Sequence, residues 1–69
     1  MPTVDARGLA CPLPLAMAKR SMASQPAGTV LVVLATDPEA PIDLAAWAVD
    51  EGHVFRERGA GEYEIEKKS

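Results

Sequence analysis

The only cysteine of the chain lies in a run whose residue types and spacing favour sulfur chemistry. From Arg7 to Pro14 the sequence reads Arg-Gly-Leu-Ala-Cys-Pro-Leu-Pro. Proline has no amide hydrogen and a fixed φ, so a helix accepts it at little cost only in its first turn. We therefore predict a helix that begins at Cys11, with Pro12 near its first position and Pro14 near its third.

A position at the start of a helix would change the reactivity of the Cys11 thiol. The amides of Leu13 and Leu15 lack helical acceptors, so we expect them to point back toward the sulfur. Together with the positive end of the helix dipole, they would lower the pKa of the thiol. The alternative is that Cys11 is a small buried hydrophobe, the commonest fate of a lone cysteine. The two prolines favour the functional interpretation.

Three basic side chains lie close in sequence to the cysteine turn, namely Arg7, Lys19 and Arg20. They could form a solvated face only, but their positive field would favour a thiolate or a persulfide. Gly8 is expected to supply a backbone conformation that a side chain would obstruct. Because the chain has no second cysteine, it could not resolve a persulfide on Cys11 internally, as a dithiol oxidoreductase would. This favours a sulfur relay over a reductase.

The pattern of apolar residues predicts four strands and two helices that would position this turn. Strands are expected at residues 3–6, 29–36, 53–58 and 62–67, and helices from residue 12 to about 23 and from residue 41 to about 51. The almost continuous apolar run at 29–36 is typical of a central strand. The order β-α-β-α-β-β predicts an α+β fold with one domain over residues 1–69. It would be a two-layer α/β sandwich, in which one mixed four-stranded sheet is backed by two helices.

The same pattern indicates which side chains face the core. On the first helix we expect burial of Leu13, Ala16 and Met17, with Ala23 or the stem of Arg20. On the second helix we expect the sheet to be faced by Ile42, Ala45, Ala46 and Val49. On the last strand the buried residues would be Tyr63 and Ile65, whereas the facing of residues 53–58 stays open. Gly52 is placed to cap the second helix, and Gly59-Ala60-Gly61 to form a hairpin turn.

The composition excludes several classes of function. The 69 residues carry a formal net charge of −3, and acidic residues outnumber basic ones ten to seven, so direct nucleic-acid binding is not expected. A single cysteine excludes an internal disulfide and suggests a reducing compartment. No signal peptide is recognisable, and no apolar run approaches the ~20 residues needed to cross a bilayer. We expect a cytoplasmic monomer, with dimerisation through an exposed edge strand left open.

The remaining candidate residues give weaker signals. His53 is the only histidine and, with one cysteine, leaves no zinc set, so neither a metal nor a cofactor is expected. We interpret His53 as structural or surface-exposed, with a partner contact as the alternative. Trp47 is expected in the core rather than at a partner contact. Asp37 and Glu39 lie in a predicted loop, where a local side-chain to backbone bond explains them better than paired catalytic carboxylates.

Residues beyond the cysteine turn complete a family signature. Residues 5–14 follow the pattern Asp-x-x-Gly-Leu-x-Cys-Pro-x-Pro, and Lys19 follows along the helix. Thr36-Asp37-Pro38 comes after the second strand, and Gly52-His53 after the second helix. With these motifs in this order, the chain resembles the TusA/SirA-like sulfur-carrier proteins over nearly its whole length. The resemblance implies the same two-layer sandwich.

The resemblance also implies a sulfurtransferase activity without a cofactor, carried by a persulfide on Cys11. The residues that shape the cysteine turn would be Arg7, Gly8, Pro12, Pro14 and Lys19. The donor would be a cysteine desulfurase or a rhodanese, and a protein acceptor would serve tRNA thiolation, molybdenum-cofactor work or sulfur oxidation. Many relatives carry a further cysteine on the second helix, where this chain has Ala48. Roles that need two thiols are therefore not expected.

Two other classes of function stay open on the sequence. The first is a non-catalytic regulatory module that docks a larger sulfur-metabolism enzyme through Trp47 or the hairpin, with the cysteine turn serving only as a helix cap. Such a protein would keep its function after Cys11→Ser. The second is a redox sensor whose Cys11 is capped by glutathione without onward sulfur transfer.

Overall fold

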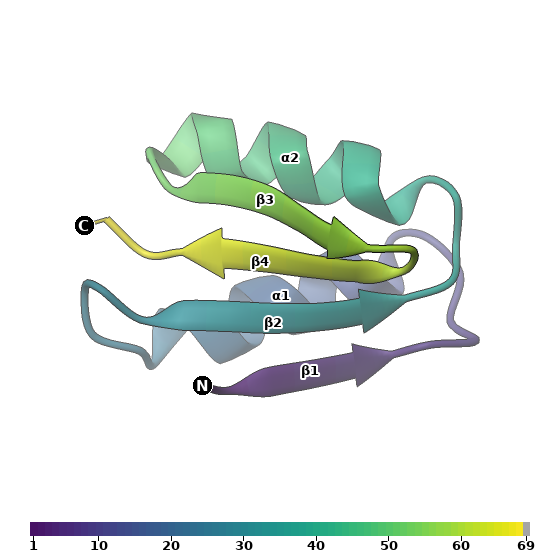
Figure 1. The fold of residues 1–69 in the computed structure, drawn as a ribbon, viewed down its shortest axis with the longest axis horizontal. Helices are drawn as coiled ribbons and strands as arrows, with labels where there is room; N and C mark the ends of the chain where they lie inside the picture. The colour runs from purple at the N-terminus through teal and green to yellow at the C-terminus, as the bar shows by residue number, and fades with distance from the viewer. Residues whose placement is uncertain (69) are drawn as a thin grey trace.

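The computed structural model describes residues 1–68 and contains the six elements in the expected order. They are β1 (Thr3–Ala6), α1 (Leu13–Ala23), β2 (Val30–Ala35), α2 (Ala40–Glu51), β3 (Val54–Gly59) and β4 (Glu62–Glu66). One sheet is backed by two helices, which lie on the same face (Figure 1). The predicted α+β sandwich is confirmed.

The sheet has the strand order β1-β2-β4-β3, with β2 in the interior as its apolar run predicts. β1 runs parallel to β2, whereas β4 is antiparallel to both of its neighbours. Ile65 pairs with Leu31 on one side and with Phe55 on the other, which places all three on the face that the helices cover. Phe55 packs against the core there, so the facing of the third strand is now assigned.

The core lies between this face and the two helices. Its largest fully buried side chains are Met22, Leu31, Leu44, Ile65, Val33 and Pro14. Tyr63 is buried as predicted and stacks on Phe55, with 5.8 Å between ring centroids. Gly52 ends α2 in the left-handed conformation, with φ of 75°, and its amide donates to the carbonyls of Ala48 and Val49. The predicted cap of the second helix is confirmed.

The predicted buried faces of both helices are wrong in large part. The buried residues of α1 are Pro14, Ala18 and Met22, whereas Leu13 is 49% exposed and Ala16 and Ala23 are exposed. Met17 packs partly on the core, as expected. On α2 the sheet side holds Ala40, Leu44 and Ala48, whereas Ile42 and Val49 are 63% and 78% exposed and Ala46 is exposed.

The cause of this error is the high alanine content of both helices. On α2 the prediction placed Ala45 and Ala46 inward and left out Leu44, because an alanine-rich helix has more than one side of similar apolar character. Where alanines face the sheet, the helices can approach it closely. Each buried row has the spacing i, i+4, i+8, with one large residue, Met22 or Leu44, and smaller ones around it. As a result, α2 has apolar residues on its outer side as well.

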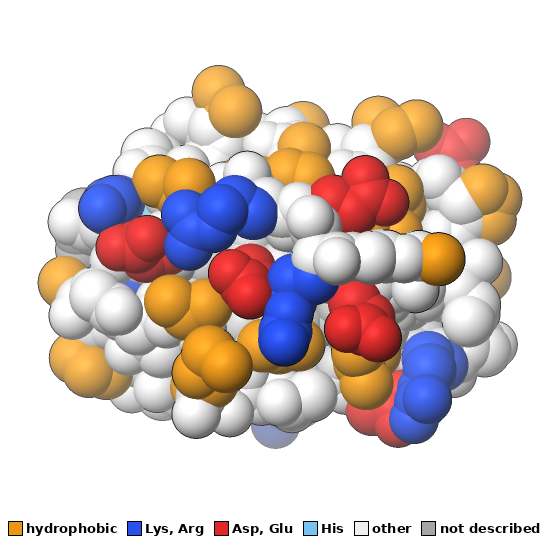
Figure 2. Space-filling view, viewed as in Figure 1, with side chains coloured by type: hydrophobic (Ala, Val, Ile, Leu, Met, Phe, Trp, Pro, Cys, Tyr) orange, Lys and Arg blue, Asp and Glu red, His pale blue; other side chains and the backbone are white. Residues whose placement is uncertain are grey.

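The other face of the sheet is open to solvent and carries cross-strand ion pairs. Arg56 pairs with Glu64 at 3.4 Å and with Glu66 at 3.2 Å, and Arg58 pairs with Glu64 at 3.1 Å. Figure 2 shows acidic and basic side chains intermixed over this face. Such exposed pairs contribute little to stability, but they cover an edge strand with charge. No helix within residues 1–68 is long and apolar enough to span a membrane.

Candidate functional site

Cys11 lies at the edge of the sheet where the chain leaves β1 toward α1 and leaves β2 toward α2. β1 and β2 are parallel neighbours, so their carboxyl ends meet at one edge of the sheet, and α1 and α2 both start from that edge (Figure 1). Cys11 is in the segment that joins β1 to α1, and it is exposed. The topology therefore brings the start of α2 beside the cysteine.

The helix begins two residues later than predicted. α1 starts at Leu13, with Pro12 as its N-cap residue and Pro14 in its first turn, and the Cys11–Pro12 peptide bond is cis. The Leu13 amide donates to the Ala10 carbonyl at 2.9 Å, which closes a turn across Cys11 and Pro12. The Leu13 amide is thereby engaged, and within residues 1–68 neither it nor the Leu15 amide donates to the sulfur. The expected amide cradle is absent from this part of the chain.

The cysteine turn is instead held by the residues that follow β2. The Cys11 amide donates to Asp37 Oδ2 at 2.8 Å, and the Glu39 amide donates to Asp37 Oδ1 at 2.7 Å. The two backbone bonds, to Glu39 first and then to Cys11, lower the pKa of Asp37. The Gly8 amide donates to Thr36 Oγ1 at 2.9 Å, and Gly8 has a φ of 81°, as its predicted role requires.

Asp37 thus has two functions where the sequence predicted one. The local bond to the Glu39 amide is confirmed. The second oxygen joins the segment after β2 to the cysteine turn, a contact between residues 26 positions apart. This explains in physical terms why Thr36-Asp37 accompanies the cysteine run, since the two segments share hydrogen bonds.

The Cys11 thiol donates a hydrogen bond to Asp43 Oδ2 at 2.8 Å. This bond is the main cause that raises the pKa of Cys11 to about 11, followed by desolvation and by the negative charges of Asp43, Asp37 and Glu39. The expectation of an easily ionised thiol is therefore wrong. A carboxylate in direct contact stabilises the thiol proton and repels a thiolate, and this outweighs the more distant helix dipole.

The three basic residues near the turn do not surround the sulfur. Arg7 binds Asp5 through two hydrogen bonds, at 2.9 and 2.8 Å, which lower the pKa of Asp5 to about 2 and raise that of Arg7. Arg20 lines a separate hollow with β1 residues. Lys19 lies on another side of α1, in a groove that also includes Asp43. The predicted positive field at Cys11 is replaced by a carboxylate environment.

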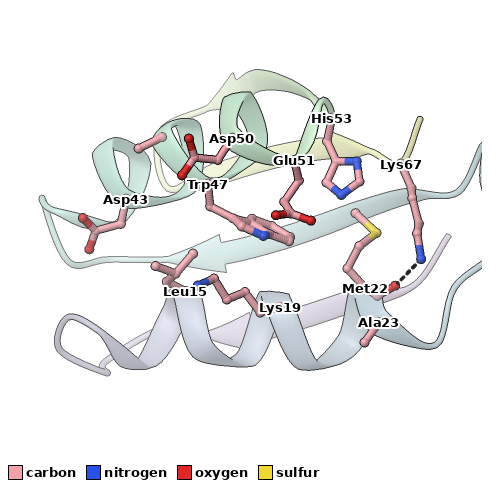
Figure 3. Close-up of a pocket in the computed structure, with 11 residues that line it drawn as sticks. Leu15, Lys19, Met22, Ala23, Asp43, Trp47, Asp50, Glu51, His53 and Lys67 are labelled. Atoms are coloured by element: carbon pink, nitrogen blue, oxygen red, sulfur yellow. Dashed lines mark hydrogen bonds between the residues drawn. The ribbon is translucent and has the colours of Figure 1, made fainter. Parts of the chain in front are cut away.

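A groove of about 720 Å³ runs between α1 and α2 (Figure 3). Its residues from α1 are Leu15, Lys19, Met22 and Ala23, those from α2 are Asp43, Ala46, Trp47, Asp50 and Glu51, and His53 and Lys67 complete it. Trp47 packs partly on the core, as expected, and meets His53 edge to face with 5.7 Å between centroids. Lys67 donates to the Met22 and Gln25 carbonyls, which fixes it at the end of α1.

Asp43 is the residue that the sequence analysis missed. It lies in the first turn of α2, which the topology places at the cysteine edge. A signal for it existed, because parallel β1 and β2 require both helices to start at the same edge. Within residues 1–68, no group of three or more possible ligands could hold a metal ion.

Comparison with known proteins identifies the family. The family described as sulfurtransferase TusA matches residues 2–67. The chain belongs to the TusA family. The sulfur carrier protein TusA of Pseudomonas syringae is 40% identical over 70 residues, covering 96% of this chain and 83% of that protein. The sulfur carrier protein TusA of Allochromatium vinosum is 43% identical over 54 residues, covering 78% of this chain and 71% of that protein.

A solved structure also matches the fold. The crystal structure of the SirA-like protein from Desulfitobacterium hafniense superimposes with a TM-score of 0.73 and 32% sequence identity. The match covers 94% of this chain and 92% of that chain. The resemblance drawn from the cysteine run therefore extends to the three-dimensional structure of this TusA-family chain.

Proposed function

We propose that this chain is a sulfur carrier in which Cys11 accepts persulfide sulfur from a donor protein and passes it to an acceptor protein. The observation that carries the proposal is the exposure of Cys11 on a turn that Asp37 and Thr36 hold in place. An exposed, fixed thiol can enter the active site of another protein. Membership of the TusA family and its sulfur-carrier relatives support this assignment.

The transfer needs no oxidant or reductant. The Cys11 thiol loses its proton, and the thiolate attacks the outer sulfur of the donor persulfide. The S–S bond of the donor breaks, the donor cysteine leaves as a thiolate that takes up a proton, and Cys11 retains the outer sulfur as a persulfide. An acceptor nucleophile then attacks that sulfur, and Cys11 leaves as a thiolate. Because Cys11 is the only cysteine, the sulfur has to leave on another molecule.

The proposed partners are proteins on both sides of the relay. The donor would be a cysteine desulfurase or a rhodanese, and the acceptor would belong to tRNA thiolation, molybdenum-cofactor work or sulfur oxidation. The raised pKa of Cys11 favours this carrier role over the redox-sensor alternative, since sensor cysteines have low pKa values and ionise without a partner. In the free chain, the hydrogen bond to Asp43 favours the protonated thiol.

Intact-mass measurement tests the proposal. The native chain and Cys11→Ser are incubated with a cysteine desulfurase plus cysteine and, separately, with polysulfide. We expect a gain of one sulfur atom in the native chain only, reversed by dithiothreitol. If neither source loads a thiol that iodoacetamide still alkylates, the carrier assignment is wrong. Unchanged function in Cys11→Ser would favour the regulatory module instead.

A further inference from the structure

Helix α2 carries an apolar row that faces away from the core. Ile42, Ala46 and Val49 have the spacing i, i+4, i+7, which places them along one side of the helix. Ile42 and Val49 are 63% and 78% exposed, and Ala46 is also exposed. The sheet-facing side of the same helix is already formed by its buried residues. The fold therefore does not need this row for its own core.

A second row lies beside the first and leads to the thiol. Asp43, Trp47 and Asp50 repeat the same spacing one residue further along, and all three line the groove between the helices (Figure 3). At the start of this row, Asp43 accepts the hydrogen bond from the Cys11 thiol. The two rows together form a surface, which we call the α2 surface, whose one end is at Cys11.

The charge of the α2 surface restricts its partner. Residues 40–51 read APIDLAAWAVDE, with three carboxylates and no lysine, arginine or histidine. Pairing of α2 with the α2 of a second copy fits poorly, because either direction brings carboxylates opposite carboxylates. An apolar patch flanked by lysine or arginine is complementary to both rows.

We propose that the α2 surface docks a partner protein of the sulfur relay whose contact patch is apolar and flanked by lysine or arginine side chains. The inference rests on the proposed function, since it assigns the partner of the same cysteine. A cation of the partner that pairs with Asp43 would compete with the thiol for that carboxylate. Docking would thereby free the thiol to ionise at the moment the donor sulfur arrives.

Two activated peptides provide the test. Each is a short helical peptide with a terminal cysteine held as a mixed disulfide with thiopyridine. One carries leucines on one side and lysines beside them, and the other has glutamates in place of the lysines. For each peptide we measure the rate at which it forms a mixed disulfide with Cys11. This rate is divided by the rate at which the same peptide reacts with a neutral small thiol in place of Cys11. We expect the lysine peptide to react about tenfold faster or more, the range that local electrostatic attraction gives.

Substitutions at exposed positions of α2 test the contributions of the charged row and the apolar row separately. Asp50→Asn should reduce the preference for the lysine peptide, and Val49→Ser should slow both peptides. Ser24→Lys, at the far end of α1, makes the same charge change as Asp50→Asn and should leave the preference unaltered. Equal normalised rates for the two peptides, or native rates in both α2 variants, would overturn the inference. Loading from polysulfide is independent of docking, so it reports on the proposed function separately.

Discussion

The two connections that start at the cysteine edge differ in what they contribute. The β1–α1 connection supplies the reactive atom, and its prolines and glycine make it recognisable in the sequence. The β2–α2 connection and the first turn of α2 supply the carboxylates around that atom, since Asp37 accepts a hydrogen bond from the Cys11 amide and Asp43 accepts one from the thiol. The cysteine motif therefore indicates the reaction, but the protonation of its thiol is controlled by a residue outside the motif.

The largest expected effect comes from the packing that holds α2 in place. Leu44 is fully buried, so Leu44→Ala should lower the free energy of unfolding by about 2–5 kcal/mol. Ile42 is 63% exposed on the same helix, so Ile42→Ala should change it by no more than about 0.5 kcal/mol. Urea denaturation of the two variants checks the difference. If both variants lost the same free energy of unfolding, Ile42 would belong to the buried face of α2, as the sequence pattern predicted.

This pair of residues also explains what the sequence could predict. The sequence predicted the order of the elements, the interior strand and the hairpin correctly, because the features behind them allow only one interpretation. Examples are the apolar run of β2 and the glycines at the turns. The buried side of α2 did not, because alanine fits a tight interface and a solvent face equally well. Periodicity identifies a helix, but it identifies a face only where one side is clearly polar.

The next effect is on the thiol itself. Asp43→Asn should bring the pKa of Cys11 from about 11 toward the 9.0 of an isolated thiol. A fall of the pKa by the full two units would raise the thiolate fraction at pH 8 about 100-fold, but a less basic thiolate is also a weaker nucleophile. Alkylation by iodoacetamide should therefore rise by up to about tenfold. Asp50→Asn, on the same groove wall without contact to Cys11, is the control. A pH profile unaltered by Asp43→Asn would show that this carboxylate does not hold the proton.

The candidate site was predictable only in part for a related reason. Cys11 and its prolines are local in sequence, so their role could be inferred from the run itself. Asp43 is 32 positions away, and its effect depends on a contact of 2.8 Å that only the parallel pairing of β1 and β2 creates. The basic residues close to Cys11 in the sequence suggested a positive environment, whereas the charges that act on the thiol in the structure are those of carboxylates.

A smaller effect concerns the bond that joins the two connections. The pKa of Asp37 is lowered by its bonds to the Glu39 and Cys11 amides, so its contribution to stability is present above the unfolded pKa of about 3.9 and is lost as pH falls through the folded value. Asp37→Asn should melt at a lower temperature than the native chain at pH 6. The difference should close toward pH 2, as followed by circular dichroism. A gap that persists at pH 2 would assign the loss to something other than the ionised carboxylate.

The smallest effect is expected at Arg7, which the family resemblance placed among the residues that shape the cysteine turn. Its guanidinium is paired with Asp5 and both side chains are largely exposed, at 61% and 55%, so solvent and the partner carboxylate screen its charge. Arg7→Ala should therefore leave the pH profile of Cys11 alkylation within about twofold, well below the effect of Asp43→Asn. A comparable shift in both variants would mean that the β1–α1 connection controls its own thiol after all. Because the Asp43 contact is direct and the Arg7 charge is already paired, the structure favours control from the β2–α2 side.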